Sequence, residues 1–124
     1  MSLVRLTLFR WLSILVLLAL PSCGSTTQSS ATPRVANGYV LERFADLAGA
    51  DLYSADLAGV DLAGANLYSA NLVGANLSNA NLSDANLAYA NLAYANLKGA
   101  NLKGANLLYT NFSGATMPDG SINE

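Results

Sequence analysis

Few residues in this 124-residue chain are able to support chemistry, and they are regularly spaced. There is no histidine, and Cys23 is the one cysteine. Four aspartates recur every five residues, at Asp46, Asp51, Asp56 and Asp61. Carboxylates could bind a cation and a thiol could carry a modification, but this spacing assembles neither a nucleophile with its base nor a set of metal ligands. We therefore expect a protein that is not an enzyme and that has no cofactor, metal or catalytic residue.

The aspartates belong to a five-residue phrase that repeats from Ala45 to Asp119. Each phrase has Ala at position one, Asp or Asn at position two, Leu at position three and variable residues at positions four and five. A period of five fits neither the helical period of about 3.6 nor the strand period of 2. The elements that position these side chains must therefore be the coils of a solenoid.

This phrase, A(D/N)LXX, resembles the repeat of the pentapeptide repeat family and covers residues 45–119 with few exceptions. The resemblance implies an all-β fold, a right-handed quadrilateral β-helix in which each phrase forms one side and four phrases form one coil. The repeat would then make just under four coils. Inward side chains would supply most of the stability: the leucines from Leu47 to Leu107, Phe112, Met117 and the alanines from Ala45 to Ala105.

Position two changes from Asp to Asn after four phrases, which is one full coil. Asp46 would then lie over Asn66, and no Asp would lie over another Asp. Stacked carboxylates would repel each other, whereas asparagine amides can form a hydrogen-bonded ladder. The four aspartates would occupy four different sides and could not converge on one cation. We interpret the change as control of register.

Residues 1–22 have the features of a signal peptide. Arg5 and Arg10 accompany the apolar run from Trp11 to Leu20, which is too short to span a bilayer. The run leads into LPSC, ending at Cys23, which resembles a bacterial lipobox, although Pro21 departs from the usual pattern. The resemblance implies lipidation of Cys23 and a lipoprotein anchored to a membrane of the cell envelope on the exported side. Ordinary cleavage nearby, giving a secreted or periplasmic soluble protein, is the alternative.

The remaining segments have separate predicted roles. Residues 23–38 are rich in Ser and Thr and would form a lipidated cysteine with a flexible tether. Residues 39–44 would form an N-terminal cap, as a short helix or an irregular turn, with Leu41 or Phe44 over the core. The β-helix would occupy residues 45–119, and residues 120–124 would be a C-terminal tail, because Pro118 and the turn that follows it should end the pairing.

The variable positions divide the β-helix into two halves. The tyrosine-rich face consists of two adjacent sides, formed by the phrases 45–49, 65–69, 85–89 and 105–109 and by the phrases 50–54, 70–74, 90–94 and 110–114. The polar half, formed by the other phrases, carries Ser, Asn, Asp and Lys. Tyrosine is enriched at interfaces, but it also suits an exposed β-surface, and both explanations stay open. The predicted interaction surface comprises Tyr53, Tyr68, Tyr89, Tyr94, Leu108 and Tyr109.

These features favour a non-enzymatic, exported, lipid-anchored structural or protein-interaction platform. If the tyrosine-rich face is an interface, it would contact a partner protein, a second copy of the chain or membrane headgroups. The alternative function is that of a DNA mimic that interacts with a topoisomerase, as implied by the resemblance to some pentapeptide repeat proteins. The export signal disfavours that alternative, and so does the weak charge, because charged residues are 11% and the net charge is −2. No binding to nucleic acid is expected.

Overall fold

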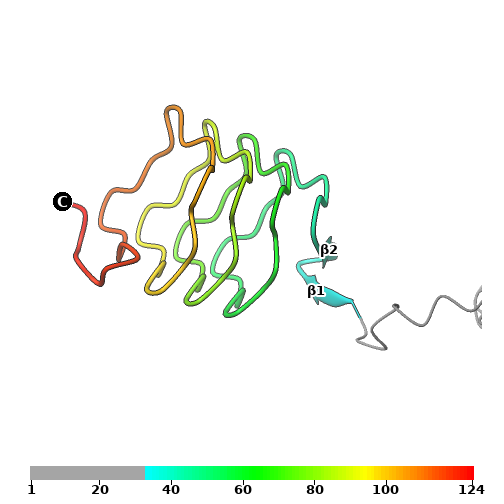
Figure 1. Ribbon diagram of the computed structural model, residues 1–124, viewed down its shortest axis with the longest axis horizontal. Coiled ribbons are helices and arrows are strands. Elements are labelled where there is room, and N and C mark those ends of the chain that lie inside the picture. Colours follow the sequence, from blue (N-terminus) through cyan, green and yellow to red (C-terminus); the bar gives the residue numbers. More distant parts are fainter. Residues whose placement is uncertain (1–32) are drawn as a thin grey trace, which may run out of the picture. The chain divides into compact units, whose positions relative to one another are not determined.

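The computed structural model describes residues 33–124, which form a short β-hairpin followed by a stack of coils (Figure 1). Strands β1 (Arg34–Ala36) and β2 (Tyr39–Leu41) pair antiparallel, with Arg34 opposite Leu41. This part of the chain contains no helix, so it has no helix that could cross a membrane. The predicted signal peptide, Cys23 and most of the predicted tether lie outside the described residues.

The stack is built by parallel bridges between residues 20 positions apart in the sequence, such as Asp46 with Asn66. The N–H of Leu47 donates to the carbonyl of Asn66 at 2.7 Å, and the N–H of Asn66 donates to the carbonyl of Ala45 at 2.9 Å. The same pair of bonds recurs on each side of the coil, as parallel bridges such as Asp51 with Asn71. This pattern confirms the all-β, right-handed quadrilateral β-helix with four phrases per coil.

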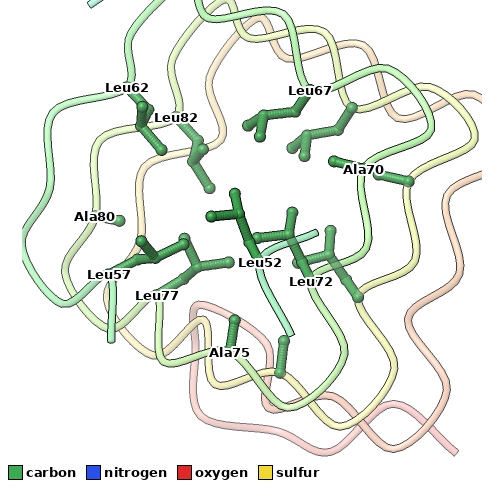
Figure 2. Packing of buried hydrophobic residues seen from close by; sticks show 14 of the residues in the cluster. Leu52, Leu57, Leu62, Leu67, Ala70, Leu72, Ala75, Leu77, Ala80 and Leu82 are labelled. Atoms are coloured by element: carbon green, nitrogen blue, oxygen red, sulfur yellow. The ribbon is translucent and has the colours of Figure 1, made fainter. Parts of the chain in front are cut away.

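The leucines at position three fill the inside of the stack. Every one of them from Leu52 to Leu97 is completely buried, and leucines of successive coils lie over one another (Figure 2). The alanines at position one lie between these columns. The inward prediction is confirmed here, but the column opens at its C-terminal end, where Leu107 is 37% exposed because no further coil covers it. Phe112 and Met117 are only partly buried for the same reason.

The N-terminal cap differs from the expectation of a helix or irregular turn. It is the β1–β2 hairpin, and it includes residues 34–38, which the sequence assigned to the tether. Asn37 and Gly38, with φ angles of 50° and 85°, form the two-residue turn. Positive φ at both positions matches the right-handed twist of paired strands, which is why Asn-Gly is a strong hairpin signal. The Asn-Gly pair is visible in the sequence, but strands of three residues are too short to show the alternation that marks a hairpin.

The hairpin closes the first coil by satisfying backbone groups that have no coil before them. The Nη1 of Arg34 donates to the carbonyl of Ala58 at 2.6 Å, and the Nδ2 of Asn37 donates to the carbonyl of Asp51 at 3.1 Å. Unpaired polar groups at an open end would otherwise be a site for unwanted strand pairing. The cap therefore seals the edge of the stack as well as its core.

Leu41 and Phe44 were the two candidates for covering the core, and only Leu41 does so. Leu41 is 6% exposed and packs with the core cluster. Phe44 is 72% exposed, and its ring lies outside the coil against Gly64, with Arg43 over the ring at 5.5 Å. Its φ of 61° and its hydrogen bond from N–H to the carbonyl of Ala63 place it at position five of a phrase that precedes Ala45.

The C-terminal residues are not a free tail. Residues 120–124 turn back and pair antiparallel with the last phrase, with Thr116 opposite Ile122. The predicted turn at Asp119 and Gly120 is present, but pairing continues beyond it, because the N–H of Asn123 donates to Ala115 at 2.9 Å. The Ser121 hydroxyl donates to Asp119 and lowers the pKa of that carboxyl, with a further contribution from the Ser121 N–H. The stability that these hydrogen bonds to the ionised carboxylate contribute is lost as the pH falls through the lowered pKa.

The predicted side-chain ladder is present at position two, and it has a direction. The Nδ2 of Asn66 donates to Asp46 at 2.9 Å, and the Nδ2 of Asn86 donates to Asn66 at 3.3 Å. Each bond runs from a coil to the coil before it, and it recurs at every step but Asn91 to Asn71. Side chains of the first coil only accept a ladder bond, so aspartate fits there. Side chains of an interior coil must also donate to the coil before them, which requires the amide of asparagine.

The substitution Asn86→Asp tests this direction. It removes the donor to Asn66 and places a carboxylate against an amide oxygen, so we expect a loss of about 1 to 3 kcal/mol in the free energy of unfolding at neutral pH. The loss should shrink below about pH 4, where the new carboxyl is protonated and regains a donor.

The matched control is Asp46→Asn, which keeps the acceptor in the same column. Chemical denaturation followed by circular dichroism measures both variants against the unmodified protein. Equal losses for the two substitutions would contradict the directional ladder.

Candidate interaction surface

The end of each phrase is a tight turn that presents two side chains outward. The carbonyl of Leu47 accepts from the N–H of Ala50 at 3.0 Å, and the same bond recurs from phrase to phrase. The fifth residue of the turn phrase has a positive φ, 66° at Gly49 and 52° at Ser54. This left-handed region favours glycine, since a Cβ crowds the backbone there. Local geometry therefore favours a small residue at position five.

Three tyrosines occupy this position despite its preference for glycine. Tyr89, Tyr94 and Tyr109 have φ angles of 61°, 60° and 57°. Bulky residues in this region are conformational outliers, and such conformations cost on the order of 1 to 3 kcal/mol each. These three rings of the tyrosine-rich face thus lie against the backbone preference, and the coils alone do not require them.

The rings of one side form a continuous ladder. Tyr68 and Tyr89 have ring centroids 5.5 Å apart with an edge-to-face angle of 61°, and Tyr89 and Tyr109 have centroids 5.1 Å apart with an angle of 34°. Aromatic pairs at these separations attract each other through their quadrupoles. The structure therefore brings together three of the predicted residues, with Leu108 exposed next to the last ring.

The other side of the tyrosine-rich face is less connected. Tyr94 is 73% exposed, and its ring lies against Gly114, where an added Cβ would be 2.6 Å from the ring. Tyr53 is also exposed. Neither ring takes part in an aromatic contact in the described part of the chain. All six predicted surface residues are outward-facing, but only those of the ladder contact one another.

The polar half uses the same stacking with different side chains. The side chain of Asn79 contacts Gly99, and that of Asp84 contacts Gly104, so a large residue again lies over the glycine of the next coil. Lys98 and Lys103 are exposed here. Phe44 lies over Gly64 on this half, and the sequence prediction missed it as a surface aromatic. Phe44 directly precedes Ala45, so counting the five-residue period back by one phrase would have placed it at an outward position five.

The described residues provide no arrangement for catalysis that could be recognised. Within residues 33–124, no group of three or more Asp, Glu, Cys or His side chains is placed to hold a metal ion, and no polar or charged side chain is buried. Cys23, the predicted lipidation site, lies outside this range. Among the described residues, the tyrosine-rich face is the surface on which aromatic rings contact one another.

The comparisons with known proteins agree with the geometry. A family model for pentapeptide repeats matches residues 45–84 and 80–117, with eight copies of the repeat. The protein belongs to the pentapeptide repeat family. Pentapeptide repeat proteins are generally non-enzymatic structural proteins. The comparison with curated proteins gave no match.

Several solved pentapeptide repeat structures are similar to this chain. HetL of the cyanobacterium Nostoc sp. strain PCC 7120, a protein involved in the regulation of heterocyst differentiation, is 43% identical over 64% of this chain, with a TM-score of 0.41. The match covers 41% of HetL, so this chain spans less than half of that relative. A pentapeptide repeat protein of the Arabidopsis thaliana thylakoid lumen is 27% identical over 77% of this chain and 78% of its own, with a TM-score of 0.41. Rfr23 of the cyanobacterium Cyanothece 51142 is 34% identical over 73% of this chain and 67% of its own, with a TM-score of 0.32.

The contact between Tyr94 and Gly114 can be tested with a matched pair of substitutions. Gly114→Ala and Gly59→Ala both place a Cβ at positive φ, but the new Cβ meets nothing within 4 Å at Gly59 and meets the Tyr94 ring at Gly114. We expect Gly114→Ala to lower the free energy of unfolding by about 1 kcal/mol more than Gly59→Ala. Thermal unfolding of both variants measures the difference. If the ring contact is the cause, the difference should disappear in a Tyr94→Ser background, and its persistence there would contradict this explanation.

Proposed function

We propose that this pentapeptide repeat protein is an exported, lipid-anchored and non-enzymatic scaffold that binds another protein through its tyrosine-rich face. The observation that carries the proposal is the exposed ladder of Tyr68, Tyr89 and Tyr109. Tyrosine offers a large contact area with a polar tip and loses little side-chain entropy on binding. A rigid column presents such rings in fixed positions, which lowers the cost of ordering them on binding.

Two features support a binding role over a purely structural one for these tyrosines. The core is complete without them, since the leucines from Leu52 to Leu97 are already fully buried. The rings at position five also occupy a backbone conformation that favours glycine. From Ala45 onward, glycine, serine, asparagine or aspartate occupies position five of the other phrases, for example at Gly49, Ser69, Asn79 and Asp84. Residues that stability does not require are candidates for recognition.

Anchoring is proposed from the N-terminal sequence. The apolar run from Trp11 to Leu20 and the LPSC motif at Cys23 support export followed by lipidation. Two or more acyl chains hold a protein firmly at a membrane, whereas one binds only marginally. The scaffold would then act beside the membrane on the exported side, where its partner would be another envelope protein.

Metabolic labelling with a palmitate analogue tests the anchor. The unmodified chain should incorporate the label and fractionate with membranes. Cys23→Ala should lose both the label and the membrane fraction, because no other cysteine is available for the thioether. Equal labelling of the two proteins would refute the lipid anchor while leaving the tyrosine-rich face untouched.

Affinity capture from envelope extracts tests the face. Tyr89→Ser with Tyr94→Ser should keep the fold, because Ser69 and Ser54 already occupy the same columns at φ of 55° and 52°. The partner recovered with the unmodified protein should be reduced at least about tenfold by the double variant, as expected when aromatic anchors are removed from an interface.

The matched control is Asn79→Ser with Asp84→Ser, which changes the same position of the phrase on the polar half. Melting temperatures of both double variants establish that each is folded. Capture that is equal for the two double variants would mean that the tyrosine rings have no role in binding.

A further inference from the structure

Two tyrosines of the tyrosine-rich face occupy the same position of neighbouring coils. Tyr89 and Tyr109 are each the fifth residue of a phrase, and they are 20 residues apart in the sequence. Their backbones have nearly the same conformation, with φ angles of 61° and 57°, and the N–H of Tyr89 donates to the carbonyl of Leu108 at 2.9 Å. The two side chains therefore leave adjacent coils in the same direction, from backbones that are held together by a hydrogen bond.

The rings of these two residues are in contact but remain open to solvent. Their centroids are 5.1 Å apart, at the short end of the range of about 4.5 to 7 Å for aromatic pairs, and their planes differ by 34°. Tyr89 is 51% exposed and Tyr109 is 71% exposed. A small oxidant in solution can thus reach both phenols, and the rings have room to turn toward each other.

The other tyrosines of this face lack the same alignment. Tyr68 is at position four of its phrase and meets Tyr89 edge-to-face, with an angle of 61° between the rings. Tyr53 and Tyr94 are well exposed, but neither ring contacts another ring within residues 33–124. They provide an internal comparison, because they are equally accessible phenols without a ring beside them.

We propose that Tyr89 and Tyr109 form a site of oxidative modification, where a one-electron oxidant of the haem-peroxidase class joins the two rings in a dityrosine cross-link. Each phenol loses one electron and one proton and becomes a phenoxyl radical. The radicals combine in a carbon–carbon bond between the ring carbons next to the hydroxyl groups. The hydrogens of those two carbons then move to the oxygens, which restores both phenols. The two electrons and two protons that were removed reduce one hydrogen peroxide to two waters.

Contact between the rings favours this pair over coupling between molecules. Holding two reacting groups together turns a bimolecular encounter into a step within one chain, which raises the rate greatly. The hydrogen bonds between the coils keep the two phenols together throughout. This inference depends neither on the proposed lipid anchor nor on a protein partner for the tyrosine-rich face.

The cross-link would fasten the last turns of the stack to the coil before them. The core column opens in this region, where Leu107 is 37% exposed. A covalent link between residues 20 positions apart restricts the unfolded chain, as a disulfide does. We therefore expect the cross-linked protein to have a higher melting temperature than the unmodified protein.

Oxidation of the full chain in mild detergent tests the site, with tris(bipyridine)ruthenium(II), visible light and persulfate as the one-electron oxidant. Persulfate takes up the two electrons and becomes two sulfate ions. Trypsin cleaves after Arg43, Lys98 and Lys103, so Tyr89 lies in the peptide 44–98 and Tyr109 in the peptide that begins at Gly104. The product should run as a monomer on a denaturing gel and show dityrosine fluorescence. Mass spectrometry should find these two peptides joined with the loss of two hydrogens.

Substitution by phenylalanine separates the chemistry from the packing, because it keeps the ring and removes the phenol. Tyr89→Phe and Tyr109→Phe should each lower the yield of the joined peptides at least about tenfold, since the remaining phenols are not held together. Tyr94→Phe is the matched control and should leave the yield unchanged, although Tyr94 lies in the same tryptic peptide as Tyr89.

Circular dichroism establishes that each variant is folded. Three results would each overturn the proposal: an unmodified chain without joined peptides, cross-links found only between molecules, or a loss of yield in Tyr94→Phe equal to that in Tyr89→Phe.

Discussion

The structure depends on one repeated backbone contact, in which the N–H of each leucine from Leu47 to Leu92 donates to the carbonyl of the asparagine 19 residues later, as Leu47 does to Asn66. This bond requires each coil to close after four phrases, so every residue lies over a residue of the same position in the phrase. The leucines are then forced into columns, and their complete burial follows from the closure of the coil. Position two is likewise stacked on position two, and the side-chain ladder reinforces the register that the backbone sets.

The same closure determines how side chains can be arranged on the outside. Because position five of one coil lies over position five of the next, two large residues compete for one space unless their rings stack. The chain uses both solutions. Phe44 and Tyr94 lie over Gly64 and Gly114, whereas Tyr89 and Tyr109 stack on each other. An aromatic residue at position five therefore needs either a glycine or a stacking ring at the same position of the neighbouring coil. The arrangement of the tyrosine-rich face thus depends on which residues share a column.

Much of this arrangement could be predicted from the sequence, since a strict period reports directly on a regular stack. The inward leucines, the Asp-to-Asn change and the outward tyrosines each follow from position in the phrase. The ends could not be predicted in that way, because the period stops there. The hairpin at Arg34–Leu41 consists of two three-residue strands, which are too short to show alternation. The pairing of Ile122 with Thr116 depends on a chain reversal, and the turn residues at Asp119 and Gly120 predict a turn but not which way the chain continues after it. The contact of Phe44 with Gly64 was hidden because Glu42 and Arg43 obscure the phrase before Ala45.

The direction of the asparagine ladder has a consequence for how such a chain can change in length over evolution. An interior coil both donates to the coil before it and accepts from the coil after it, so duplication of 20 residues inside the stack preserves the pattern of the ladder. A coil inserted ahead of Asp46 would find four carboxylates with no donor to offer it. The aspartates thus mark the beginning of the column as a fixed boundary. Growth or shortening by whole coils is compatible with the polar ladder only on the C-terminal side of that boundary.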